Sequence, residues 1–208
     1  MQATSYKLTE LFMFFVVIPV SFALDFAIWM KMAIGLLGFA YVIYVLFKVE
    51  KNKFKVKKGL NWKWFWRQTL IKLIGIAAIT TIYMFIVDKD NLFIVLRTKP
   101  MLWTVILFIY SFFSVYPQEL IYRTFFFQRY QSLFKNEWLF IIVNAALFSL
   151  AHIFFRNTLV MFLTFIGGIL FALTFKTTKS TILVSIEHAI YGSWLFTVGM
   201  GNMLGFPS

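Results

Sequence analysis

Apolar residues occur along the chain in long continuous blocks, which short polar segments separate. The blocks do not alternate apolar and polar positions, so they do not fit the strands of a membrane β-barrel. A block of about 20 apolar residues can cross the hydrocarbon core of a bilayer as a helix, because a helix pairs its own backbone groups. The pattern therefore predicts an all-α, polytopic transmembrane helix bundle, with spans at 11–24, 31–47, 70–87, 101–134, 138–155, 159–175 and 181–198.

The segment 101–134 is too long for one simple crossing, since 34 helical residues extend about 51 Å. Pro117 lies in its middle and favours a break in the helix. A complete reversal at Pro117 would give eight spans, whereas a continuous or kinked helix gives seven. We predict seven spans.

Composition and charge agree with a membrane protein. Hydrophobic residues make up 61% of the chain and charged residues 13%, against about 45–50% and about 25% in soluble domains. The first apolar block lacks a small-residue cleavage signature, so we interpret it as a retained span and not as a signal peptide. The absence of cysteine excludes disulfides, thiolate metal sites and a cysteine nucleophile.

The net charge is +12, and nine of the 20 basic residues lie in the loop region 48–72. Short basic loops stay in the cytoplasm. This predicts a cytoplasmic N-terminus in a bacterial cytoplasmic membrane and, with seven spans, an external C-terminus. Anionic lipids, and not nucleic acid, are the expected partner of this loop. Trp62, Trp64 and Trp66 follow the basic run and are expected at the membrane interface.

Few ionisable side chains lie inside the predicted spans, where a charge is costly and usually functional. Those expected to lie deep, away from the span ends, are Glu119, Arg123, His152, Glu187 and His188. Glu119 and Arg123 are one helical turn apart and, taken alone, indicate a structural ion pair. Glu119 and His152 are each 15 residues from a turn expected near 135–136, so they should lie at the same depth. An acid facing an imidazole suits acid–base chemistry on water, although a lone buried histidine is more often a structural one.

His188 fits this picture less directly. It is nine residues past Lys179, about 14 Å deep, whereas Glu119 and His152 are about 22 Å from their turn. Glu187 and His188 point about 100° apart on a helix, so both cannot face one point. The chain has no HExxH and no GxSxG motif, which argues against a zincin helix or a serine nucleophile elbow.

Three motifs follow one another on the late spans: PQELIYR, FSLAH and EHAIYGS. In this order they resemble the CPBP family of intramembrane proteases, which includes the CAAX prenyl endopeptidases and bacterial relatives linked to bacteriocin maturation and immunity. The family pattern is EExxxR, then FxxxH, then HxxxN or a similar residue at the last position. The resemblance divides the chain into an N-terminal three-span region, 1–100, with the basic loop, and a protease-like core, 101–208.

The resemblance implies an intramembrane endopeptidase that acts on a peptide or protein substrate at the membrane. Glu119 with His152 would deprotonate a water, His188 would stabilise the oxyanion, and Arg123 would keep Glu119 ionised. No cofactor is expected; zinc is the alternative, since two histidines and a carboxylate can bind it.

Two positions depart from the family pattern. Gln118 stands where the family has its first acid, the residue assigned to activate water, and Gly192 stands where the family has asparagine. A glutamine cannot act as a base, and glycine offers no side-chain donor. Ser193 is a candidate substitute for the missing donor. Two alternatives therefore stay open: a catalytically dead member that acts as a binding or immunity protein, and an unrelated transporter or proton relay that uses Glu119, His152 and Glu187.

Overall fold

The structure of the protein, a computed structural model, describes residues 4–52 and 59–204. Seven of the described helices are long and apolar enough to cross a membrane. This confirms the predicted all-α membrane bundle and the count of seven spans. The spans are Thr4–Phe22, Ile28–Val49, Trp62–Val87, Pro100–Leu133, Glu137–Phe155, Thr158–Thr178 and Thr181–Val198.

The first two spans and the fourth each combine several helical segments. The first joins α1 (Thr4–Phe12), η1 (Met13–Val17) and α2 (Ile18–Phe22), and the second joins α3 (Ile28–Tyr44) and η2 (Val45–Val49). The fourth runs through α6 (Pro100–Ile109), η4 (Tyr110–Val115), α7 (Tyr116–Glu119), η5 (Leu120–Phe125), α8 (Phe126–Tyr130) and η6 (Gln131–Leu133).

Pro117 does not reverse the chain. It lies at the start of α7, directly after the π-helical segment η4, and the helix continues into a second π-helical segment, η5. π-Helical turns change which residues face a neighbouring helix, and they are frequent at functional sites. The two π segments thus flank the short α7, which carries the PQE of the first motif.

The remaining elements are single helices or short turns. They are α4 (Trp62–Val87), η3 (Lys89–Asn91), α5 (Ile94–Thr98), α9 (Glu137–Leu150), η7 (Ile153–Phe155), α10 (Thr158–Thr178), α11 (Thr181–Val198) and η8 (Met200–Leu204). Polar caps fix where the late helices begin: Asn136, Asn157 and Ser180 accept backbone N–H bonds at the starts of α9, α10 and α11. The expected turn before α9 is therefore present.

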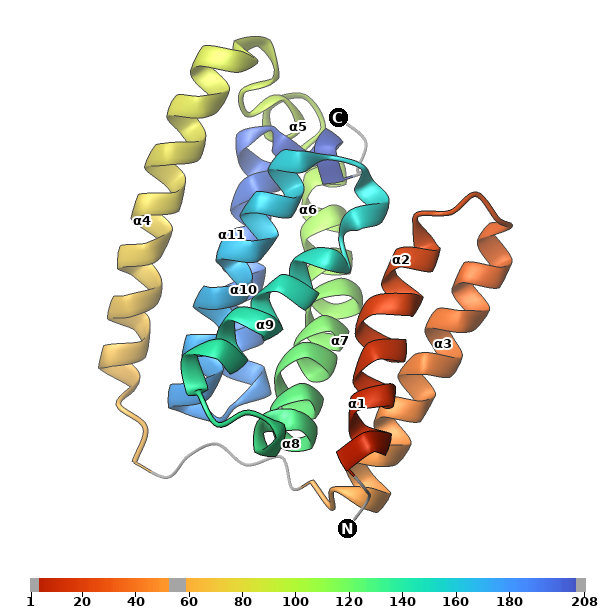
Figure 1. The fold of residues 1–208 in the computed structure, drawn as a ribbon. Helices are drawn as coiled ribbons and strands as arrows, with labels where there is room; N and C mark the ends of the chain where they lie inside the picture. The colour runs from red at the N-terminus through yellow and green to blue at the C-terminus, as the bar shows by residue number, and fades with distance from the viewer. Residues whose placement is uncertain (1–3, 53–58, 205–208) are drawn as a thin grey trace.

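In the bundle, α9, α10 and α11 pack beside the long helix of α6–α8, while α1–α3 lie on one side and α4 on the other (Figure 1). Gly168 on α10 allows close approach to α9, because a Cβ there would lie 2.9 Å from the Ala145 Cα. The outer face of α4 is apolar and exposed, as at Ile79 and Ile86, which suits contact with lipid.

A buried polar cluster joins the N-terminal spans to the fourth span, and we call it the anchor cluster: Glu10, Tyr41, Glu50, Arg129 and Tyr130. Arg129 donates from Nε to Glu10 Oε2 and from Nη1 to Glu50 Oε1, each at 2.8 Å. Tyr130 donates to Glu10 at 3.1 Å, and the Tyr41 hydroxyl donates to the same carboxylate. The cluster therefore ties α1, η2 and α3 to α8.

The basic loop is described only in part, since Lys53, Lys55, Lys57 and Lys58 lie outside the described residues. Trp62, Trp64 and Trp66 are exposed in the first turns of α4, at the end of the bundle where α1 begins (Figure 1). The opposite end holds η8, and the predicted external C-terminus, 205–208, lies outside the described residues. The orientation of the bundle, its lipid partner and the division into two regions stay predictions.

Candidate active site

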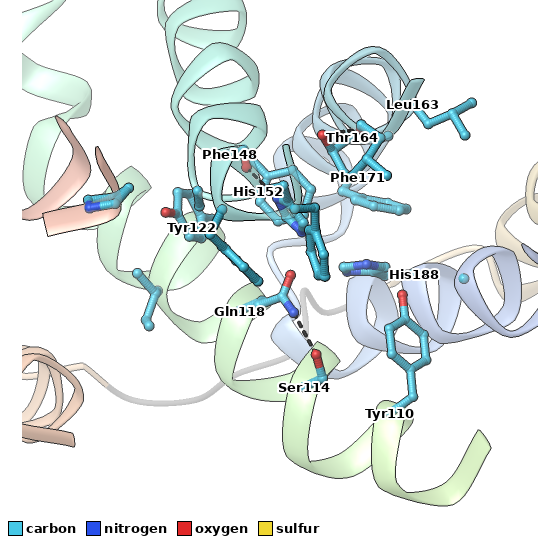
Figure 2. A pocket seen from close by; sticks show the side chains of 18 of the residues that line it. Tyr110, Ser114, Gln118, Tyr122, Phe148, His152, Leu163, Thr164, Phe171 and His188 are labelled. Carbon is cyan, nitrogen blue, oxygen red and sulfur yellow. Dashed lines mark hydrogen bonds between the residues drawn. The ribbon is translucent and has the colours of Figure 1, made fainter. Parts of the chain in front are cut away.

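An apolar cavity of about 410 Å³ lies inside the bundle, between the N-terminal hairpin and the late helices. Most of its wall consists of phenylalanine and aliphatic side chains from η1, α2, α3, α9, α10 and α11. Its polar lining residues are Tyr191 and, among the residues labelled in Figure 2, Tyr110, Ser114, Gln118, Tyr122, His152, Thr164 and His188. Both histidines of the chain therefore reach one cavity from different helices.

His152 follows the last turn of α9, and its ring faces the cavity (Figure 2). Its Nδ1 lies 2.8 Å from the backbone oxygen of Phe148. A carbonyl oxygen only accepts hydrogen bonds, so Nδ1 carries the proton and a neutral ring keeps a free lone pair on Nε2. His152 thus offers an acceptor nitrogen to a ligand in the cavity.

His188 lies on α11, and Glu119 contacts its ring on the side away from the cavity. The Nδ1 of His188 lies 2.7 Å from Glu119 Oε1. An ionised carboxylate only accepts, so Nδ1 again donates and Nε2 stays an acceptor. The ring of His188 stacks on Phe171 with centroids 4.3 Å apart. Both imidazoles also pack on the Phe148 ring, with centroid distances of 4.9 Å for His152 and 5.7 Å for His188.

Glu119 is completely buried and is not a lining residue of the cavity. Its Oε2 lies 3.2 Å from the Nε of Arg123, which is also completely buried. We call Glu119, Arg123 and His188 the site cluster. The expected support of Glu119 by Arg123 is present, but the carboxylate contacts His188 and not His152. Glu119 therefore reaches the cavity only through His188.

Arg123 is held by the second motif helix. It donates from Nη1 to Asn144 Oδ1 and to the Tyr122 carbonyl, and Asn144 donates to the same carbonyl at 2.8 Å. Its guanidinium lies 4.9 Å from the Phe148 ring centroid, in cation–π contact. Asn144 and Phe148 on α9, and His152 directly after it, are spaced by four residues, and Phe148 contacts both Arg123 and His152.

Gln118 faces the cavity at the position where the family pattern has an acid (Figure 2). Its Nε2 donates to Ser114 Oγ at 2.8 Å, and its Oε1 has no hydrogen-bond partner among the described residues. Among the residues that the structure describes, no carboxylate lines the cavity. The wall beside the two imidazoles is thus neutral.

Glu187 belongs to a different cluster. It is buried, accepts from Lys72 Nζ and from the Tyr191 hydroxyl at 2.8 Å each, and so points toward α4. The predicted divergence of Glu187 and His188 is therefore present. A relay through Glu119, His152 and Glu187 has no support in these contacts, because Glu187 bonds to Lys72 and Tyr191.

Sequence reasoning missed Tyr110 as a site residue. It begins the π segment η4, and its hydroxyl lies where a side chain at position 192 would start, since a Cβ on Gly192 would overlap it. Ser193, the suggested substitute donor, is not among the lining residues. No motif or residue spacing in the sequence marks Tyr110, because the direction of its side chain depends on a π turn.

The described part of the chain holds no group of three or more histidine, aspartate or glutamate side chains arranged to bind a metal ion. The expectation that no cofactor is needed stays a prediction. His152 and His188 are the two side chains that would contribute ligands to a metal.

Comparison with known families extends these observations. Residues 100–194 match the family described as type II CAAX prenyl endopeptidase Rce1-like. No curated protein and no solved structure matches the chain. The matched segment contains all three motifs and every member of the site cluster, and it confirms the resemblance drawn from those motifs. Residues 100–194, a little under half of the 208-residue chain, are therefore similar to the CAAX-type prenyl endopeptidases that this family describes.

Proposed function

We propose that the cavity binds and hydrolyses a peptide as an intramembrane endopeptidase of the CAAX-protease type. The observation that carries this proposal is the pair of imidazoles that share one apolar cavity, one of them backed by a buried carboxylate. Such a carboxylate orients the ring, fixes its tautomer and stabilises the imidazolium that forms when the ring takes a proton.

In the proposed reaction, a water binds between the Nε2 atoms of His152 and His188 and attacks the scissile carbonyl. His188 takes one proton from the water as the C–O bond forms. The new imidazolium then lies against Glu119, whose second oxygen faces Arg123. When the C–N bond breaks, His188 returns the proton to the leaving amine, so no net proton stays on the protein.

Gln118 and the apolar wall would serve binding. The Oε1 of Gln118 has no partner among the described residues and would accept a hydrogen bond from the water or from a substrate N–H. The cavity wall is mostly aromatic and aliphatic, which suits a peptide that carries an apolar lipid chain or lies in the membrane. A prenylated peptide is the first substrate to test.

The test uses the full chain in liposomes with a farnesylated, internally quenched peptide that ends in a CAAX sequence. We expect the wild type to cleave it, and we expect His188→Ala and His152→Ala to lose cleavage while they still bind a non-hydrolysable form of the peptide. Cleavage that persists in His188→Ala would overturn the assignment of the base. A chelator should have no effect; loss of cleavage with a chelator and recovery with zinc would instead indicate a metal held by the two histidines.

A second candidate, a binding or immunity protein without hydrolytic activity, is favoured by one observation. No described carboxylate lines the cavity, and Gln118 stands in the family's acid position. If this candidate is correct, the wild type binds the peptide without cleaving it, and Gln118→Glu creates cleavage. If the main proposal is correct, Gln118→Glu changes an existing rate only modestly.

A further inference from the structure

The Tyr110 hydroxyl lies beside the proposed base, and none of the residues that the structure describes forms a hydrogen bond with it. The residue lines the cavity, and no hydrogen bond to its hydroxyl is found within the described part of the chain. Buried tyrosine hydroxyls usually find a partner. A donor left available at the wall of a reaction cavity is therefore a candidate to bind the substrate.

Packing fixes the position of this hydroxyl. The Tyr110 ring meets Phe196 edge to face with centroids 4.8 Å apart, and it meets His188 in the same manner at 6.0 Å. Since η4 begins at Tyr110, the π turn directs the ring toward α11. The hydroxyl is thus preorganised next to His188 and needs no rearrangement to meet a ligand.

Gly192 makes room for Tyr110. It lies one helical turn after His188 on α11, and a Cβ at this position would overlap the Tyr110 hydroxyl and its ring edge. The glycine and the tyrosine are therefore a matched pair: a side chain at 192 and the hydroxyl of Tyr110 exclude each other from the same space. In the family pattern this position usually carries asparagine. In this chain the Tyr110 hydroxyl, from η4, therefore occupies the space that the asparagine amide would take on α11.

We propose that the Tyr110 hydroxyl donates a hydrogen bond to the carbonyl oxygen of the scissile peptide and stabilises the oxyanion that forms when water attacks. This rests on the proposed hydrolytic function. Tyr110 keeps its proton throughout, and His188 carries the proton taken from the water. Tyr110 would then be a catalytic residue in addition to His152 and His188.

Removal of the hydroxyl alone is the first test. Tyr110→Phe keeps the ring and its packing, so the fold should remain intact. We expect kcat for the farnesylated peptide to fall roughly 100-fold with little change in KM, because the bond strengthens only as charge develops on the oxygen. A purely packing role for Tyr110 predicts an unchanged kcat and would overturn the proposal.

The exchange between positions 110 and 192 is the sharper test. Gly192→Asn alone should lose cleavage, because its side chain overlaps Tyr110. Tyr110→Ala should also lose cleavage, since the donor is gone. The double variant Tyr110→Ala with Gly192→Asn should recover much of the rate, because an amide donor then fills the vacated space. A double variant no better than Tyr110→Ala would contradict an oxyanion role for this space.

A binding measurement separates failure of this proposal from failure of the proposed function. A farnesylated peptide phosphonate mimics the charged tetrahedral intermediate, whereas the matching peptide with a reduced amide bond lacks the oxyanion. Tyr110→Phe should weaken binding of the phosphonate at least roughly tenfold and leave the reduced-amide peptide unchanged. If the wild type cleaves nothing but shows this selectivity, the hydrolytic proposal fails and the Tyr110 site stands. Equal loss for both peptides, or no loss, would refute the Tyr110 site.

Discussion

Two buried glutamate–arginine pairs lie in this membrane bundle, and their surroundings differ. In the anchor cluster, Glu10 and Arg129 meet at 2.8 Å, and Glu50, Tyr41 and Tyr130 add further bonds. In the site cluster, Glu119 and Arg123 approach only to 3.2 Å. Glu119 Oε2, Arg123 Nε and Arg123 Nη2 have no hydrogen-bond partner of good geometry among the described residues.

We interpret the difference as that between a structural pair and a pair that takes part in the proposed reaction. A buried ion pair stabilises a protein only when hydrogen bonds satisfy its remaining atoms, and the anchor cluster meets that condition. Glu119 instead directs its better bond to His188, a side chain that faces the cavity. Incomplete satisfaction of buried polar groups next to a cavity is typical of a site that binds or reacts. On the proposed function, the same residue types serve anchoring in one place and chemistry in the other.

The largest expected effect compares matched glutamines in the two clusters. Glu119→Gln should lower kcat for the farnesylated peptide roughly 10³- to 10⁴-fold, because the imidazolium of His188 loses its counter-charge and the ring its fixed tautomer. Glu10→Gln removes a carboxylate of similar burial and should leave kcat per folded molecule unchanged. Both rates are measured in liposomes after correction for folded protein. Equal losses in the two variants would show that Glu119 acts only through stability.

The second comparison concerns stability. Glu119→Gln leaves Arg123 buried without a carboxylate, so the free energy of unfolding should fall by about 3–5 kcal/mol. Arg129 still pairs with Glu50 when Glu10 is replaced. The loss of unfolding free energy in Glu10→Gln should therefore lie at or below the low end of that range. Denaturant unfolding in detergent micelles, followed by tryptophan fluorescence, measures both. A larger loss for Glu10→Gln would mean that the anchor cluster depends on Glu10 more than its shared bonds indicate.

The smallest effect is expected at the third buried acid. Lys72→Met leaves Glu187 with the Tyr191 hydroxyl as its remaining hydrogen-bond donor. The free energy of unfolding should fall by about 1–3 kcal/mol, with little change in kcat, because Glu187 points toward α4. The same unfolding and cleavage assays test this variant, with Lys176→Met as the control for an exposed ion pair. A strong loss of kcat in Lys72→Met would extend the site beyond the cavity.

Periodicity and block length were sufficient to predict the membrane architecture. All seven spans were expected, because lipid forces each long apolar block into a helix, and five of them lie within three residues of their predicted bounds. The first and third helices begin seven and eight residues before the predicted spans, because they continue into the polar segments ahead of their apolar blocks. Helix rise alone did not predict that His188, on the last span, lies at the same depth as Glu119 on the fourth span. The fourth span carries two π segments, and each changes the depth and the face of the residues around it.

Spacing and motif order predicted a set of candidate site residues, but not their contacts. The sequence brought together Glu119, Arg123, His152 and His188, and these residues do gather beside one cavity. It paired Glu119 with His152, whereas the structure pairs it with His188, because π turns alter the direction of the side chains on the fourth span. Tyr110 was not predicted as a site residue for the same reason. Its proposed role depends on the space left by the missing side chain of Gly192, and residue spacing in the sequence does not describe such a space.

The central claim is that Glu119 acts on the cavity through His188, and nitrogen-15 NMR of the histidines tests it most directly. The chain has only two histidines, so selective labelling in detergent micelles gives two rings to assign, with His188→Ala identifying one of them. We predict that both neutral rings carry their proton on Nδ1, and that Glu119→Gln shifts the signals of His188 much more than those of His152. A proton on Nε2 of His188, or signals of His188 that do not respond to Glu119→Gln, would contradict the account.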